Sequence, residues 1–180
     1  MMKMNNTLIL CDLDGTLIDS DKLNSYSYIA VIEQLGFDVP IELKDKKRIT
    51  EKELRSCMPS LLKEDILQIK QFKLNIFLKN INMLRLNSEL LDEITKSYAT
   101  VCICTSSKLE RAEPECNLLD IKHDAIISLK KTKAELERAV NELEGKFGNF
   151  ERIICYDDDE EVLKAAADCG FETVLVRFGM

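Results

Sequence analysis

The sequence lacks several features that would place it in other classes of protein. No run approaches the roughly 18 consecutive apolar residues of a membrane-spanning helix, and no signal-peptide-like apolar segment precedes the first predicted strand. No C-x-x-C pair occurs, and His123 is the single histidine, which argues against a zinc cluster. The chain has a net charge of −7 and no basic stripe, so nucleic acid is an unfavourable partner.

The seven cysteines do not indicate a disulfide framework. Their number is odd, and four of them lie inside short apolar runs, namely Cys11, Cys102, Cys104 and Cys155. Buried free thiols in a reducing compartment are the simpler interpretation. We therefore expect a soluble cytoplasmic protein that does not bind a membrane, and the sequence indicates no oligomeric state.

Short apolar runs bounded by turn residues predict the strands of a parallel sheet. Strands of this kind are buried on both faces because helices cover both sides of the sheet. In this chain the first run opens the predicted fold, and each later run follows a helix-like stretch. The candidates are residues 8–11, 99–104, 152–156 and 173–176, with 125–127 as a weaker one. With 46% hydrophobic residues in 180, the chain can bury a core, and the alternation predicts an α/β fold.

Two helices between these strands have recognisable ends. Thr132 and Glu135 fit a capping box, and the following helix is predicted to stop at Gly145. A second helix is predicted over residues 160–168, with Gly170 as its C-terminal stop.

Residues 20–86 differ from the rest because they indicate helix after helix without a convincing strand. An amphipathic helix is predicted to end at Gly36, and residues 61–84 predict two more helical stretches. We expect residues 20–86 to form a helical domain inserted into a core made of residues 1–19 and 87–180. Residues 20–96 are near neutral to slightly basic whereas their flanks are acidic, which suits an anionic substrate but also fits ordinary solvated helix faces.

Asp12 and Asp14 follow the first apolar run directly, with Gly15 next to them. Ligands bind at the carboxyl ends of strands in such sheets, and two acids at a buried strand end favour a cationic or phosphorylated ligand. The alternative is an Asp-Gly turn that merely closes the strand.

The segment Asp12-Leu13-Asp14-Gly15-Thr16-Leu17-Ile18-Asp19-Ser20 resembles the first motif of the haloacid dehalogenase (HAD) superfamily. It is most similar to the capped phosphoglycolate phosphatase and beta-phosphoglucomutase-like subfamily. The resemblance implies a doubly wound, Rossmann-like parallel sheet with an inserted α-helical cap. It also implies that Asp12 is the nucleophile that attacks phosphorus and that Asp14 is the general acid and later the base.

The second motif of that family is a Ser or Thr at the end of the next strand, where this chain has Thr105 and Ser106. The resemblance implies that the Thr105 hydroxyl and the Ser106 backbone N–H bind a phosphoryl oxygen. A Ser/Thr helix N-cap after a strand is the alternative, although a helix N-terminus is itself a phosphate site.

The third motif is a lysine that neutralises charge around the nucleophile. Lys131 is favoured by the likeness to the family's Lys-Pro-x-Pro-Asp/Glu run, but both prolines are missing here. Lys133, near the predicted helix start, stays as the alternative, and Lys130 is a third choice.

The fourth motif is acidic, and Asp157-Asp158-Asp159 follows the apolar run 152–156. The resemblance places Asp158 on the metal-binding aspartate, with Asp157 or Asp159 supporting the metal without ligating it, and Val162 offers no further ligand. Successive carboxylates repel one another, which favours a bound cation, and oxygen ligands suit Mg²⁺. The implied protein ligands are the Asp12 carboxylate, the Asp14 backbone carbonyl and Asp158.

The sequence therefore predicts a Mg²⁺-dependent phosphatase that acts on a small phosphorylated metabolite through an aspartyl-phosphate. A phosphomutase of the beta-phosphoglucomutase type, a 5'-nucleotidase and a non-catalytic binding protein of the same fold are the alternatives. The substrate itself is not indicated, because its contacts are expected in the helical insertion.

Overall fold

The computed structural model describes residues 6–178, and a five-stranded parallel sheet organises most of them. The sheet contains β1 (Thr7–Cys11), β4 (Thr100–Thr105), β5 (Ala125–Ser128), β6 (Arg152–Asp157) and β7 (Glu172–Leu175). Their order is β5-β4-β1-β6-β7, and every neighbouring pair is parallel. All five predicted strands are confirmed, and so is the α/β class.

The order of the strands creates a switch point beside β1. From β1 the chain moves outward to β4 and β5, then returns to the other side of β1 for β6 and β7. Crevices that bind ligands form at the carboxyl ends of strands where the direction of winding reverses. The residues that directly follow β1, β4 and β6 are therefore brought to one edge of the sheet.

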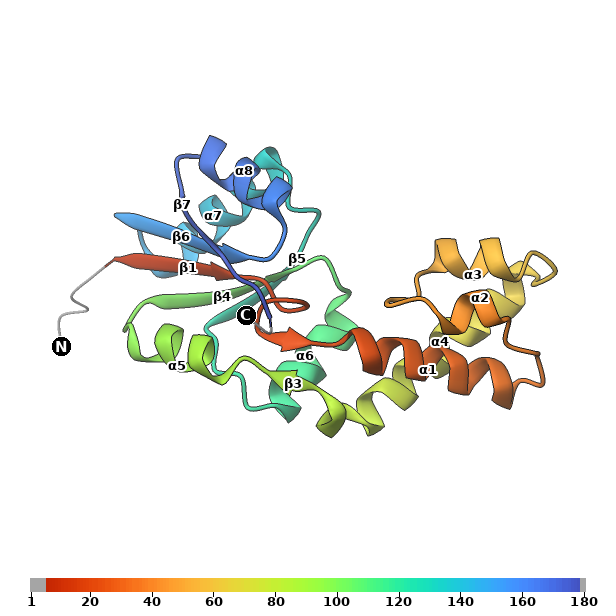
Figure 1. Cartoon of the computed structure of the whole chain (residues 1–180). Coiled ribbons are helices and arrows are strands. Elements are labelled where there is room, and N and C mark those ends of the chain that lie inside the picture. The colour runs from red at the N-terminus through yellow and green to blue at the C-terminus, as the bar shows by residue number, and fades with distance from the viewer. Residues whose placement is uncertain (1–5, 179–180) are drawn as a thin grey trace. The chain divides into compact units, whose positions relative to one another are not determined.

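Helices cover both faces of this sheet (Figure 1). Figure 1 shows α7 (Lys133–Phe147) and α8 (Glu160–Asp168) on one face, with α5 (Ser88–Lys96) and α6 (Leu109–Leu118) on the other. Leu8 and Leu10 of β1 pack in one buried cluster with Leu136 and Leu143 of α7 and Leu163 of α8. The runs of the central strands β1, β4 and β6 are apolar because these strands are buried between helices on both faces of the sheet.

The ends of α7 differ in part from the prediction. The Thr132 hydroxyl accepts the Glu135 backbone N–H at 3.3 Å, which is one half of the predicted capping box. The Glu135 carboxylate accepts the Lys130 backbone N–H at 2.7 Å in place of that of Thr132. The predicted stop at Gly145 is wrong, because the helix continues to Phe147 and ends at Gly148. Gly148 has a φ of 91°, which glycine adopts without strain, whereas a glycine inside a helix costs only about 1 kcal/mol relative to alanine.

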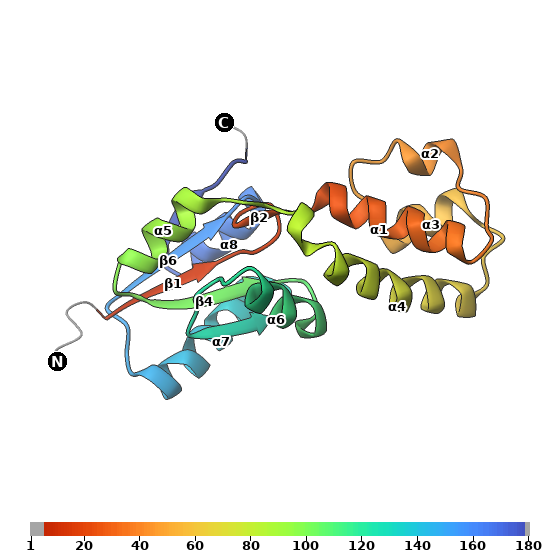
Figure 2. The same cartoon turned by 90° about the horizontal axis from the view of Figure 1, so that it is seen from below.

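Residues 20–84 form a second compact unit, which is helical. It contains α1 (Asp21–Gln34), α2 (Ile41–Lys44), α3 (Glu51–Cys57), α4 (Lys63–Lys79) and a short 3₁₀ turn (Ile81–Met83). Helices α1 and α4 run side by side (Figures 1 and 2). The unit has its own apolar core, which includes Tyr28, Val31, Leu54 and Ile69. Residues 61–84 hold one long helix and the 3₁₀ turn in place of the two helical stretches predicted there.

The two ends of this insertion lie next to each other in the sheet-containing unit. β2 (Ile18–Asp19) pairs antiparallel with β3 (Arg85–Leu86), with Ile18 opposite Leu86 and Asp19 opposite Arg85. The division of the chain falls between residues 19 and 20 and between residues 84 and 85.

The cysteines agree with the sequence prediction. All seven are free, and Cys11, Cys102, Cys104, Cys116 and Cys155 are buried. Within residues 6–178, no helix has the length and apolar character to cross a membrane.

Candidate active site at the carboxyl edge of the sheet

The candidate site is built where β1, β4 and β6 end side by side. Asp12 directly follows β1, Thr105 ends β4 and Asp157 ends β6. The Asp12 backbone N–H donates to the Tyr156 carbonyl at 2.9 Å, which extends the β1–β6 pairing up to the acid. The sheet itself thus positions these residues.

Lys131 brings the acidic ends of β1 and β6 together. Its Nζ lies 2.5 Å from Asp12 Oδ1 and 2.7 Å from Asp157 Oδ2, and its side chain is only 7% exposed. Lys133, the alternative in the sequence analysis, is exposed and pairs with Glu137 on its own helix at 3.9 Å. Lys130 is also exposed. Of the three lysines, Lys131 is the one in contact with the Asp12 carboxylate.

Burial controls the ionisation of these acids when no metal is bound. It raises the pKa of Asp12 from 3.8 to about 7; the Lys131 ammonium opposes that rise, and the Asp157 carboxylate adds to it. Burial also raises the pKa of Asp157, again against the effect of Lys131. Because a buried cation beside two acids is itself stabilised, the pKa of Lys131 is raised by Asp12 and Asp157 despite the opposing effect of burial.

Asp158 completes an acidic cluster with Asp12 and Asp157. One carboxylate oxygen from each lies within 4.8 Å of the others. The Thr16 hydroxyl donates to Asp12 Oδ2 at 3.0 Å and approaches Asp158 Oδ1 at 3.5 Å. When ionised, the three carboxylates carry two more negative charges than the Lys131 ammonium group offsets. Every atom that they offer to a metal ion is an oxygen. This donor set fits a divalent cation such as Mg²⁺, which prefers carboxylate and carbonyl oxygens.

Asp157 and Asp159 have different surroundings, which bears on the choice left open by the sequence. Asp157 accepts the Lys131 ammonium and, through Oδ1, the Asp159 backbone N–H at 3.0 Å. Asp159 is exposed, and its carboxylate caps α8 by accepting the Glu161 N–H at 2.9 Å. Asp157 is therefore the one of the two that joins the acidic cluster.

A tight loop carries the second acid of the first motif. The Leu17 and Ile18 N–H groups both donate to the Leu13 carbonyl at 3.0 Å, and Leu13 and Leu17 are fully buried. Gly15 in this loop has a φ of 85° and lies against the Asp158 side chain, so that a Cβ there would clash with the carboxylate. Glycine is needed both for the backbone conformation and for the space.

Asp14 is held by residues that the sequence analysis did not assign a role. The Ser107 hydroxyl donates to Asp14 Oδ2 at 2.9 Å, and Arg111 Nη2 donates to Asp14 Oδ1. Arg111 also lies 3.5 Å from Glu115 Oε1, and Glu115 is fully buried. The signal in the sequence is the spacing of Ser107, Arg111 and Glu115 at intervals of four, which on a helix is also typical of surface ion pairs.

Thr105 and Ser106 stand at the end of β4, next to β1. The Thr105 hydroxyl is buried and accepts the Ser107 backbone N–H at 3.0 Å. Thr105 is not a helix cap, because α6 begins at Leu109 after Lys108. Ser106 is exposed. Both residues stand at the edge where Asp12 stands, and their contact with phosphate stays a prediction.

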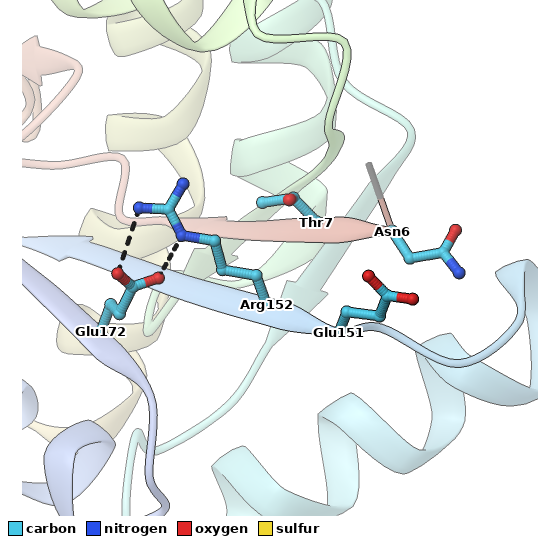
Figure 3. Close-up of a pocket in the computed structure, with 5 residues that line it drawn as sticks. All are labelled: Asn6, Thr7, Glu151, Arg152 and Glu172. Atoms are coloured by element: carbon cyan, nitrogen blue, oxygen red, sulfur yellow. Dashed lines mark hydrogen bonds and ion pairs between the residues drawn. The ribbon is translucent and has the colours of Figure 1, made fainter. Parts of the chain in front are cut away.

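A pocket of about 450 Å³ lies at the opposite edge of the sheet (Figure 3). It is lined by Asn6, Thr7, Glu151, Arg152 and Glu172, where β1, β6 and β7 begin. Its one cationic residue, Arg152, is engaged by Glu172, with 3.1 Å between Nη2 and Oε1. The pocket contains none of the candidate catalytic residues, and its acidic lining does not suit a phosphorylated substrate.

The fold and the site define an α/β protein with a carboxylate and lysine cluster at the carboxyl edge of its sheet. The sequence matches the model of the haloacid dehalogenase-like hydrolase family over residues 9–176, and the chain belongs to that family. A search of curated proteins gave no significant sequence match.

Solved structures of similar fold agree with the family match. A haloacid dehalogenase-like family hydrolase from Streptococcus pneumoniae is 21% identical with a TM-score of 0.66, covering 99% of this chain and 87% of the other. CbbY from Rhodobacter sphaeroides in complex with phosphate is 18% identical with a TM-score of 0.66 (97% and 87% covered). A predicted phosphoglycolate phosphatase from Haemophilus somnus is 17% identical with a TM-score of 0.71 (96% and 86% covered). At these identities the likeness establishes the fold.

The contact between Gly15 and Asp158 gives a first prediction. Gly15→Ala is expected to lower the melting temperature and to weaken the further stabilisation by Mg²⁺, because the new Cβ displaces the Asp158 carboxylate. Gly170→Ala is the matched control, since Gly170 has a φ of 84° but open space around it. Melting curves over a Mg²⁺ titration compare the two variants. Equal Mg²⁺ responses would contradict the role of the clash.

The raised pKa of Asp12 gives a second prediction, for protein treated with EDTA. In the folded state Asp12 keeps its proton up to about pH 7, whereas in the unfolded chain it loses the proton near its ordinary pKa of 3.8. Between these pH values the folded state therefore binds more protons than the unfolded state does. Its stability is therefore expected to fall as pH rises through about 7. Melting temperatures between pH 5 and pH 8 test this. Asp12→Asn, which does not titrate, should flatten the decline, and an unchanged decline in that variant would exclude Asp12 as its source.

Proposed function

We propose that this protein is a Mg²⁺-dependent phosphomonoesterase that acts on a small phosphorylated metabolite. The observation that carries the proposal is the contact of Lys131 with Asp12 and Asp157 beside Asp158. This arrangement offers a carboxylate nucleophile, a fixed cation and a set of oxygen ligands at one edge of the sheet. Phosphoryl transfer needs these three elements, since its catalysis depends on positioning and charge stabilisation.

Asp12 is the proposed nucleophile of the first step. A carboxylate oxygen of Asp12 attacks the phosphorus, the bond from phosphorus to the leaving oxygen breaks, and Asp14 donates its proton to that oxygen. The products are the free alcohol and an aspartyl-phosphate on Asp12. Lys131 favours the ionised form of Asp12 against the effect of burial and offsets negative charge near the phosphoryl group.

The second step returns the enzyme to its starting state. Asp14, now a carboxylate, takes a proton from a water molecule as that water attacks phosphorus, and the bond from phosphorus to Asp12 breaks with its electron pair returning to the carboxylate. Inorganic phosphate leaves. The two steps together convert a phosphate monoester and water into an alcohol and phosphate.

The proposed protein ligands of Mg²⁺ are the Asp12 carboxylate, the Asp14 backbone carbonyl and Asp158, with Asp157 supporting them. When bound, the ion supplies positive charge that neutralises the transferring phosphoryl oxygens. In the protein itself, Thr16 orients Asp12 by donating to Oδ2, and Gly15 leaves the space that Asp158 occupies. Thr105 and the Ser106 N–H are the proposed contacts of the remaining phosphoryl oxygens.

We propose that residues 20–86 act as a cap that supplies the substrate contacts. Support comes from the independent apolar core of this segment, which lets it keep its own shape, and from the family to which the chain belongs. A structure of similar fold, CbbY from Rhodobacter sphaeroides, contains xylulose-1,5-bisphosphate. Sugar phosphates therefore belong among the first substrates to test, together with phosphoglycolate and nucleoside monophosphates. A cytoplasmic location fits the seven free cysteines.

The test of this function is phosphate release from such a panel with Mg²⁺ or with EDTA. Asp12→Asn is expected to lower turnover about a thousandfold or more, on the scale found when a covalent nucleophile is removed. Asp92→Asn is the matched control, because Asp92 is an exposed aspartate on α5 that pairs with Lys96. Release that is independent of Mg²⁺, or equal in both variants, would contradict the proposal.

The same panel separates the hydrolase from a mutase. A phosphomutase uses the same aspartates but returns the phosphoryl group to its substrate, so that isomerised sugar phosphate, dependent on a sugar bisphosphate, would appear in place of free phosphate. Binding of phosphorylated compounds without any turnover would favour a non-catalytic role.

A further inference from the structure

Both carboxylate oxygens of Asp14 are engaged by residues at the start of α6. The Ser107 hydroxyl donates to Oδ2 at 2.9 Å, and Arg111 Nη2 donates to Oδ1. The side chains of Arg111 and Asp14 are 11% and 13% exposed. A partly buried ion pair with a second hydrogen bond restricts the carboxyl group to one orientation far more firmly than an exposed pair would.

Arg111 is in turn fixed by Glu115 and by Ser107. Glu115, fully buried one turn further along α6, lies 3.5 Å from Arg111 Nη2, and Arg111 Nη1 donates to the Ser107 hydroxyl at 3.3 Å. A buried glutamate is costly unless a cation accompanies it. Asp14 and Glu115 both raise the pKa of Arg111 against the effect of burial. The guanidinium is therefore a permanent cation held between two carboxylates.

The two donors on Asp14 differ in what they permit. A guanidinium has only N–H donors, so the oxygen that it holds can only accept. A serine hydroxyl can donate or accept, so the oxygen beside Ser107 can carry a proton without losing its partner. The two oxygens of Asp14 are thus made unequal by their surroundings.

We propose that Arg111, held by Glu115 and Ser107, is a positioning residue that fixes the Asp14 carboxyl for proton transfer. Arg111 keeps Oδ1, and Oδ2 is the oxygen that passes the proton to the leaving oxygen. This inference rests on the proposed function, in which Asp14 is the general acid. Arg111 itself does not touch the substrate and forms no bond in the reaction.

The test uses leaving groups that differ in their need for a proton. An alkoxide is a poor leaving group and requires the general acid, whereas p-nitrophenolate leaves readily as an anion. For Arg111→Gln we expect the single-turnover rate of leaving-group release from an alkyl phosphate, divided by that from p-nitrophenyl phosphate, to fall about tenfold or more, since general acid catalysis contributes about 10² to 10⁴. A single turnover isolates the first step from the second, in which Asp14 acts as base on the same intermediate for both substrates. Arg111→Lys should recover part of the ratio.

Two further variants guard against a folding defect. The double variant Arg111→Gln with Glu115→Gln removes both buried charges together, and it should show the same fall in ratio. Arg138→Gln is the matched control, because Arg138 is exposed and pairs only with Glu135 among the ion pairs of the described residues; it should leave the ratio unchanged. Circular dichroism and melting curves confirm that each variant is folded.

The outcomes separate this inference from the function on which it rests. If the unaltered chain releases phosphate with Mg²⁺ but the folded Arg111 variants slow leaving-group release equally from both substrates, Arg111 has a structural role only and the inference is overturned. If the unaltered chain releases no phosphate from any substrate, the proposed function fails and the inference fails with it. A selective loss on alkyl phosphates, in the single-turnover rate of leaving-group release and not only in KM, supports it.

Discussion

The structure at the candidate site depends on the burial of two carboxylates beside one ammonium group. Asp12 and Asp157 are 6% and 2% exposed, and both lie against Lys131. Isolated charges in such a place would be neutralised by a change in pKa, as the rise for Asp12 shows. The ammonium group compensates only part of this negative charge, because Asp158 adds a third acid. The remaining charge can be offset by a divalent cation, which gives the site a physical reason to bind one.

The same constraint explains features that do not themselves carry charge. Gly15 is required where the loop passes against the Asp158 carboxylate, and Thr16 places a hydroxyl between Asp12 and Asp158. The buried Leu13 and Leu17 anchor that loop to the apolar interior. The acids thus keep fixed positions although like charges repel, because hydrogen-bond donors and apolar contacts hold each one separately.

Much of this could be predicted from the sequence because each strand is a short apolar run followed at once by a polar residue. That pattern located Asp12, Thr105 and the acidic run at 157–159 on one edge of the sheet. The sequence could not decide between Lys131 and Lys133. Side chains two positions apart at a helix start point in roughly opposite directions, and only the tertiary fold shows which of the two reaches Asp12. Arg111 gave no distinct signal, because its spacing to Glu115 is equally typical of an exposed pair. The prediction that α7 ends at Gly145 was wrong because a glycine is tolerated within the helix.

The two acids of the first motif, two residues apart, are held by partners from different parts of the chain. Asp12 is paired with an ammonium group that it shares with Asp157, and it faces the acidic cluster. Asp14 turns instead toward α6, where a guanidinium and a hydroxyl hold its two oxygens. Each acid has a cation on Oδ1 and a hydroxyl on Oδ2, and the hydroxyl belongs to Thr16 for Asp12 and to Ser107 for Asp14. What distinguishes Asp12 is the acidic cluster beside it, whose oxygens can share a divalent cation with the Asp12 carboxylate. Lys131 and Asp157, beside Asp12, come from the segment before α7 and from the end of β6, whereas the partners of Asp14 follow β4 at the start of α6. One short loop can therefore present two carboxylates with separate tasks.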